Sequence, residues 1–261
     1  MQAVVLLKQV LDPEIPQKAF GVDPDRKVPQ VDRAPQVLSI FDGNALELAL
    51  RLRESREGVR IVALTLGPAG ADDVLRKALA LTVDEAVRVS ADSVGLDSQQ
   101  KARLLAAAIG QMGPVDLVLS GRQAADWEAG QVGAMVAEAL SLPCVPFVSR
   151  VEGSDPLLVR QQLESGHAIL RIPGPAVLTV TNDETNVLRP AKVKDVMAAS
   201  RRQIRVLDMA DLGPLDLGEP QVDLLSLSLP PGRAGAEMIE GESAQAKAQA
   251  LARRLRQIGA V

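Results

Sequence analysis

Residues 116–133 read DLVLSGRQAADWEAGQVG, and this stretch decides the fold. A buried strand ends at Gly121, a polar turn follows, and helical sequence resumes over 128–142. In an open parallel sheet, ligands bind beyond the carboxyl ends of the strands, and N–H groups at a helix start can bind phosphate. Gly121, Gly130 and Gly133 allow a close backbone approach to a ligand or to the sheet. Because the turn is neither G-x-G-x-x-G nor a P-loop, it fits both a nucleotide site and plain strand–helix packing.

The same alternation of strand and helix extends on both sides of this turn. It predicts strands at 3–7, 60–67, 84–90, 116–121, 144–152 and 176–181, and helices at 43–55, 71–81, 98–112 (capped by Ser98) and 128–142. Two β-type runs around Ser165-Gly166 predict an antiparallel hairpin. Strand and helix in turn predict a doubly wound α/β sheet with right-handed crossovers. Gly67-Pro68 forms a second strand-end turn on the same sheet edge and gives the crevice two walls.

Two segments depart from this alternation. Five prolines punctuate residues 11–38 and predict an ordered loop or lid. After residue 182, a basic run is followed by irregular sequence over 207–241 and a closing helix at 243–258, with Ser243 as its N-cap. We therefore expect an α/β nucleotide-binding domain over 1–185, and over 186–261 a docking segment with an arm that lies on a partner chain.

The composition of the 261-residue chain excludes several classes of function. The net charge of −4 gives no general attraction for nucleic acid, and no apolar run is long enough to insert in a membrane. Met1 leads directly into a strand with no charged region before it, so we expect no secretory signal and a cytoplasmic protein, or one of the mitochondrial matrix in a eukaryote. The single cysteine, Cys144, excludes a disulfide within the chain and reads as a small buried hydrophobe.

The candidate chemical groups are few. The only histidine, His167, has no partner cysteine or second histidine, so we interpret it as a surface turn residue and expect no metal site. Trp127 stands in a polar turn, where it either stacks on a ring or covers the start of a helix. No acid–base pair or nucleophile emerges, so no catalytic residue is predicted. A binding or carrier role is favoured over hydrolysis.

Several motifs, taken together and in order, resemble the β subunit of electron-transfer flavoproteins over nearly the whole chain. They are VVLLKQVLDP, SIFDGNALELALRL, ALTLGPAGADDVLRKALAL, DLVLSGRQAADWEAGQVG, VKDVMAASRRQI and RAGAEMIEGESAQAKAQAL. The sequence departs from the family pattern where Ser39-Ile40 replaces Asn-Pro and where Trp127-Glu128 replaces small or acidic residues.

The resemblance implies a Rossmann-like fold of the adenine nucleotide α-hydrolase type, with an antiparallel hairpin and an extended C-terminal arm. It also implies a heterodimer in which the α subunit holds most of the FAD and the arm wraps that subunit. Electrons would arrive from a donor dehydrogenase and leave to a quinone reductase or another acceptor. Because the flavin carries this chemistry, the scarcity of catalytic side chains is expected.

The resemblance further implies particular site residues. The adenylate site corresponds to Leu6, Ser39, Leu66, Gly121, Ala124, Trp127, Gly130, Gln131 and Val132, and Phe41 keeps an aromatic of the family near the flavin. Val193, Val196 and Met197 correspond to the segment that docks the donor dehydrogenase, with Val193 as its apolar anchor.

The ligand of the β subunit itself has two interpretations. Family members carry either a structural AMP or a second FAD that permits electron bifurcation with NADH as donor. Val132 resembles the bifurcating group, whereas Trp127 and Ala129 do not, so AMP is favoured. Two other classes are a stand-alone adenine-nucleotide module of the stress-protein type and an adenylate-using pyrophosphatase. The long C-terminal segment disfavours the first, and the absence of a Gly-rich phosphate loop and of a nucleophile disfavours the second.

Overall fold

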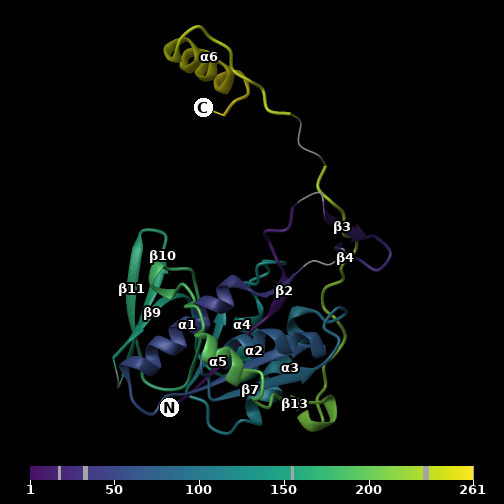
Figure 1. The fold of residues 1–261 in the computed structure, drawn as a ribbon, viewed down its shortest axis with the longest axis vertical. Coiled ribbons are helices and arrows are strands. Elements are labelled where there is room, and N and C mark those ends of the chain that lie inside the picture. The colour runs from purple at the N-terminus through teal and green to yellow at the C-terminus, as the bar shows by residue number, and fades with distance from the viewer. Residues whose placement is uncertain (17–18, 32–34, 154–155, 232–234, 261) are drawn as a thin grey trace. The chain divides into compact units, whose positions relative to one another are not determined.

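A nine-stranded sheet organises the part of the chain that the computed structural model describes, residues 1–16, 19–31, 35–153, 156–231 and 235–260 (Figure 1). The strand order is β11-β10-β9-β12-β8-β1-β6-β7-β13. The strands are β1 (Gln2–Leu6), β6 (Arg60–Gly67), β7 (Glu85–Ser90), β8 (Leu117–Gly121), β9 (Cys144–Glu152), β10 (Leu157–Leu163), β11 (Gly166–Ile172), β12 (Ala176–Val180) and β13 (Arg205–Leu207). Pairings from β9 through β12, β8, β1, β6 and β7 to β13 are parallel, whereas β10 is antiparallel to β9 and β11. The predicted mostly parallel sheet and its hairpin are confirmed.

Helices cover both faces of this sheet. They are α1 (Ile40–Ser55), α2 (Asp72–Ala80), α3 (Ser98–Gly110), α4 (Val132–Ala139) and α5 (Val193–Ala199). Side chains of a strand point alternately to the two faces, so Ala3 and Val5 pack with α1 and α2, whereas Val4 and Leu6 pack with α3 and α4. Two aliphatic cores result, one on each face. This is the doubly wound arrangement that the sequence predicts.

Two compact units make up the described chain. The first comprises Met1–Leu227 and holds the sheet, and the second comprises Ser228–Val261 and holds helix α6 (Ala244–Gln257). Ser243 caps α6 as predicted, accepting the N–H of Ala246 at 3.1 Å. The expected division at residue 185 and the wrapping of a partner by the arm stay predictions. Among the described residues, no helix has the length and apolar character needed to cross a membrane.

The proline-rich segment 11–38 is more regular than the predicted loop. It contributes to two small antiparallel pairs, β2 (Gln9–Leu11) with β5 (Gln36–Leu38) and β3 (Phe20–Asp23) with β4 (Val28–Val31). The described residues of this segment are ordered and contain no α-helix, as predicted, but the segment is not a loop throughout, because strands lie within it. Proline is tolerated here because short two-stranded ribbons leave many N–H groups unpaired. Residues 17–18 and 32–34 of this segment are not among the residues that the structure describes.

Two helix starts also differ from the prediction. Asp97, not Ser98, caps α3, because its carboxylate accepts the N–H of Gln100 at 2.8 Å while the Gln100 side chain bonds back to the Asp97 N–H. Helix α4 begins at Val132 rather than at residue 128. Glu128 and Gly130 have φ values of +52° and +65°, and this left-handed backbone cannot continue a right-handed helix.

The single histidine and the single cysteine of the chain are placed only partly as expected. His167 is exposed, but it lies in β11 opposite Gln162 rather than in the turn, and its Nδ1 is 3.2 Å from Arg160 Nη2. Cys144 opens β9 and is only partly buried, so the prediction of a buried residue is wrong. Partial burial nevertheless raises the pKa of its thiol, which disfavours the reactive thiolate.

Candidate nucleotide site at the carboxyl edge of the sheet

The carboxyl ends of four neighbouring strands, β12, β8, β1 and β6, form the edge where the sequence predicts a ligand. Leu6, Leu66 and Gly121 lie at or next to the ends of β1, β6 and β8. Helix α1 starts at this edge, and Ser39 is its N-cap residue. The fold therefore brings together segments that are more than 100 residues apart in the sequence.

Asp42, which the sequence analysis did not select, joins these segments. It lies in the first turn of α1 with only 7% of its surface exposed. One carboxylate oxygen accepts the N–H of Gly121 at 2.9 Å, and the other accepts the N–H of Lys8 at 2.8 Å. A single side chain thus holds the end of β8 and Lys8, two residues after β1, against the helix. No local sequence signal identifies this role, because Gly121 is 79 positions away.

Burial raises the pKa of Asp42 to about 7. The two backbone N–H donors and the Lys8 ammonium oppose this shift, whereas Asp126 adds to it. Desolvation disfavours the charged carboxylate more strongly than two hydrogen bonds favour it. This edge of the sheet therefore contains a carboxyl group whose charge changes near neutral pH.

Gly121 is required by the close approach of α1. A Cβ atom at this position would lie 2.7 Å from both Asp42 Oδ1 and Phe41 Cβ. Real Cβ atoms do not approach neighbours so closely, so any side chain would displace the start of α1 from β8. This close contact supports the interpretation that Gly121 serves strand–helix packing, one of the two roles that the sequence leaves open.

The start of α4 has the features of an anion site. Its N-cap residue, Gln131, makes no side-chain capping bond, so capping leaves the first-turn N–H groups unsatisfied. Beneath this turn lies Ser120, only 5% exposed, with no hydrogen-bond partner for its hydroxyl. A Cβ on Gly133 would lie 2.5 Å from Ser120 Oγ, so glycine lets the helix approach the hydroxyl. Free N–H groups and an unpaired hydroxyl suit a phosphate.

Unpaired buried polar atoms concentrate at this edge. Among the described residues, four buried side-chain atoms lack a hydrogen-bond partner, and three of them belong to Ser39, Ser120 and Arg122, around the ends of β1 and β8. Buried polar groups are nearly always paired, so a cluster of exceptions indicates partners supplied by a ligand or by water. Ser39 is completely buried and is among the residues that the family resemblance implies.

Arg122 follows Gly121 and is a second residue that the sequence analysis did not select. Its guanidinium carbon lies 4.8 Å from the centre of the Phe41 ring, and Nη1 donates a long 3.4 Å bond to Thr181 Oγ1. Its Nε is buried and unpaired. A stacked arginine with donors to spare is well suited to an anionic or planar ligand.

Further cations face the same edge. Lys8 Nζ pairs with Asp126 at 2.7 Å. Partial burial and the positive charge of Lys8 lower the pKa of Lys101 on α3, while Asp126 and Asp97 act in the opposite direction. Mixed charges of this kind can be rearranged by an added phosphate group.

The other predicted nucleotide residues are more open. Ala124 and Val132 are partly buried, Gly130 and Gln131 are exposed, and 51% of the surface of Trp127 is exposed. Trp127 therefore offers free ring surface. The backbone places all five in the turn between β8 and α4 or at the start of α4.

The predicted docking residues lie together on the short helix α5. Val193, Val196 and Met197 expose 79%, 51% and 63% of their surfaces. The helix packs on α2, where Arg76 Nη1 donates to the carbonyl of Ala199 at 2.8 Å. Figure 1 shows α5 beside α2, outside the sheet. The exposed apolar side chains are therefore displayed on a fixed element.

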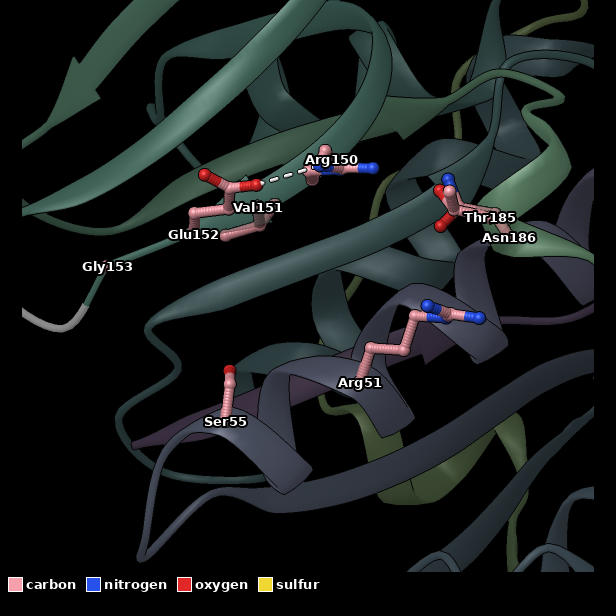
Figure 2. A pocket seen from close by; sticks show the side chains of 8 residues that line it. All are labelled: Arg51, Ser55, Arg150, Val151, Glu152, Gly153, Thr185 and Asn186. Carbon is pink, nitrogen blue, oxygen red and sulfur yellow. Dashed lines mark hydrogen bonds and ion pairs between the residues drawn. The ribbon is translucent and has the colours of Figure 1, made fainter.

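A cavity of about 550 Å³ lies away from these residues (Figure 2). Eight residues line it: Arg51, Ser55, Arg150, Val151, Glu152, Gly153, Thr185 and Asn186. Its two arginines already have carboxylate partners, Arg51 with Glu47 and Arg150 with Glu152. The cavity contains none of the predicted nucleotide residues. Within the described residues, no group of three or more His, Cys, Asp and Glu side chains could hold a metal ion.

Comparison with known proteins identifies the family. Residues 30–212 match the model of the electron transfer flavoprotein domain. The chain is 33% identical to the electron transfer flavoprotein subunit beta of Thermoanaerobacterium thermosaccharolyticum, covering 94% of this chain and 95% of that protein. It is 32% identical to the same subunit of Sus scrofa over 100% of this chain and 99% of that protein.

A third relative is the caffeyl-CoA reductase-Etf complex subunit CarD of Acetobacterium woodii, 31% identical over 98% of both chains. The matches extend over nearly the whole length, as the ordered motifs of the sequence predict. This chain belongs to the electron transfer flavoprotein family and is a beta subunit with a role in electron transfer.

Proposed function

We propose that this chain pairs with an electron-transfer flavoprotein α subunit and holds AMP at the carboxyl edge of its own sheet. The FAD held mainly by the α subunit supplies the redox chemistry. The chain supports that flavin, docks the donor dehydrogenase, and delivers electrons to a quinone reductase or another acceptor. The observation that carries the nucleotide proposal is the cluster of unpaired buried polar atoms on Ser39, Ser120 and Arg122.

The donor set at this edge fits a phosphate ester. The uncapped first turn of α4 offers N–H groups, and the Ser120 hydroxyl beneath it has no protein partner. Leu6, which is buried, and Leu66, which is partly buried, lie at or next to the ends of β1 and β6 and would supply the apolar surface that an adenine ring requires. One phosphate would satisfy the helix start and the hydroxyl together.

A second FAD is the alternative ligand, and it would make the protein a bifurcating electron-transfer flavoprotein. Val132 supports it, because valine offers no hydroxyl to a single phosphate. The exposed ring of Trp127 is compatible with both ligands. The stacked guanidinium of Arg122, with its unpaired Nε, would suit the second phosphate of a dinucleotide.

The test is a count of bound flavin and AMP in the heterodimer co-expressed from both subunits and purified without added nucleotide. One FAD and one AMP per heterodimer is the expected result. Two FAD and no AMP would reverse the choice of ligand and make NADH oxidation the activity to assay. The chain purified alone is expected to hold FAD poorly, so a yellow, redox-active monomer would contradict the need for the α subunit.

A further inference from the structure

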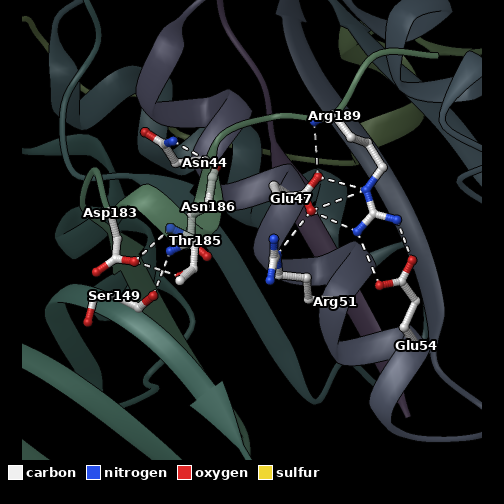
Figure 3. A network of polar contacts seen from close by, with 9 residues as sticks. All are labelled: Asn44, Glu47, Arg51, Glu54, Ser149, Asp183, Thr185, Asn186 and Arg189. Carbon is white, nitrogen blue, oxygen red and sulfur yellow. Dashed lines mark hydrogen bonds and ion pairs between the residues drawn. The ribbon is translucent and has the colours of Figure 1, made fainter.

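A buried carboxylate on α1 organises the segment that leads into the docking helix (Figure 3). The side chain of Glu47 is only 2% exposed, and Figure 3 shows it between the side chains of Arg51 and Arg189. Its oxygens accept the Nε of Arg189 at 2.9 Å, the Nη2 of Arg189 at 2.7 Å and the Nε of Arg51 at 3.1 Å. The backbone N–H of Arg189 adds a fourth donor at 3.2 Å.

Arg189 is thus held by both its backbone and its side chain. The guanidinium of Arg189 also pairs with Glu54, about two turns further along α1 than Glu47, with Nη2 to Oε2 at 3.1 Å. These two carboxylates hold the pKa of Arg189 above its usual value, and Arg189 in turn lowers the pKa of Glu54. The planar guanidinium reaches both acceptors at once, which the single ammonium of a lysine cannot do.

The neighbouring residues extend the same attachment. Asn44, one turn before Glu47 on α1, donates to the carbonyl of Asn186 at 2.8 Å, and Asn186 donates to the carbonyl of Ser149 at 2.6 Å. Residues 187–192 belong to no helix or strand. Their path is therefore set by side-chain contacts to α1 rather than by regular structure.

This path ends at α5, which begins only four residues after Arg189. The far end of α5 is fixed separately. Arg76 of α2 bonds the Ala199 carbonyl at 2.8 Å, and Arg202 bonds the carbonyls of Val83 and Asp84. The seven-residue helix is too short to be stable by itself, so its orientation depends on these attachments at both ends together with its packing against α2.

We propose that Arg189, held by Glu47, is a positioning residue for donor docking: it fixes the start of α5 and so pre-organises the exposed face of Val193, Val196 and Met197. This inference rests on the proposed docking role of α5. Removing the attachment would make the donor order the helix on binding, so affinity falls while the electron-transfer step itself is unaffected. Arg189 does not touch the donor in this account.

The experiment uses the co-expressed heterodimer and, as donor, a flavin dehydrogenase that reduces the wild-type protein. Arg189→Met is expected to raise the KM for the donor about tenfold, with kcat and the flavin spectrum unchanged. Hydrogen exchange of amides 187–199 in the free heterodimer should accelerate. Arg189→Lys should give an intermediate KM because it keeps one charge and loses the fork.

The control is Arg60→Met, which removes a somewhat more exposed arginine from the Arg60–Glu85 pair at the start of β6. Its KM and its exchange over 187–199 should equal those of the wild type. If Arg189→Met fails to assemble, Arg189→Lys and Glu54→Gln keep the buried Glu47 partly neutralised and answer the same question.

Either of two results would overturn the proposal: exchange over 187–199 that is unchanged in the Arg189 variants, or faster exchange with an unchanged KM. Failure of the docking role itself is distinguishable. In that case Val193→Ala leaves the donor KM unchanged, whatever the Arg189 variants do. A raised KM in Val193→Ala together with a wild-type KM in Arg189→Met rejects the positioning role alone.

Discussion

The carboxylate of Asp42 accepts the backbone N–H of Gly121 at 2.9 Å and links the first turn of α1 to the end of β8. The second oxygen of Asp42 accepts the N–H of Lys8. The candidate nucleotide site is therefore built around a carboxyl group whose two oxygens both accept backbone N–H groups. Its properties lead to the first two predictions.

Asp42 should make the protein less stable as the pH rises. Its folded pKa of about 7 lies above the unfolded value of 3.8, so between these values the folded state binds more protons. The protonated form adds on the order of 4 kcal/mol to the free energy of unfolding below pH 3.8. This contribution is lost as the pH rises from 3.8 to 7. Thermal unfolding of the heterodimer at pH 5 and pH 8, compared with Asp42→Asn, measures this. Parallel pH profiles for the two proteins would contradict the assignment.

Gly121→Ala should destabilise the protein by about 2 kcal/mol or more and release the β-subunit nucleotide. The added Cβ would lie 2.7 Å from Asp42 Oδ1 and Phe41 Cβ, so the start of α1 must move. Urea unfolding and a nucleotide count on the variant test both effects. Gly110→Ala is the control, because its Cβ meets nothing within 4 Å and alanine favours a helix. Equal stability of the two variants would show that β8 and α1 are not in such close contact.

Ser39→Ala and Ser120→Ala should separate binding from folding. Both hydroxyls are buried without a protein partner, so removing them leaves the nucleotide-free protein as stable or up to about 1 kcal/mol more stable. If the nucleotide is their partner, retention of AMP during purification should fall. Ser243→Ala, which removes the N-cap of α6, is a useful contrast, because it should cost about 1 kcal/mol of helix stability without affecting AMP. Full AMP retention in both site variants would remove these serines from the site.

Val193→Ala and Met197→Ala should slow electron transfer from the donor dehydrogenase and leave the flavin spectrum unchanged. The two side chains expose 79% and 63% of their surfaces, and exposed apolar anchors with flanking charges are typical of docking surfaces. Steady-state reduction by the donor is the measurement. Val94→Ala, at another exposed valine with 69% of its surface accessible, should behave like the wild type. Wild-type rates in both α5 variants would identify α5 as an ordinary helix face.

The local pattern of the sequence was sufficient to predict most helices and strands and their order along the chain. Continuous aliphatic runs such as residues 3–7 predict strands that are buried on both faces. The alternation of these strands with helices predicts a doubly wound parallel sheet. Turn chemistry at Ser165-Gly166 and the cap at Ser243 also act over a few residues, so both were predicted correctly. The ordered family motifs added the function, because they report shared ancestry rather than local physics.

Tertiary structure alone decided which polar residues are buried and what they contact. Asp42, Glu47 and Arg122 look like surface residues in the sequence, because their partners are 79, 142 and 59 positions away. The start of α4 was likewise decided by the left-handed backbone at Glu128 and Gly130. Strands β2 and β5 were decided by pairing with each other across the proline-rich segment. Periodicity records which face of an element is apolar. It does not record which distant donor comes within 3 Å of a carboxylate, because that distance is set by how the chain closes on itself.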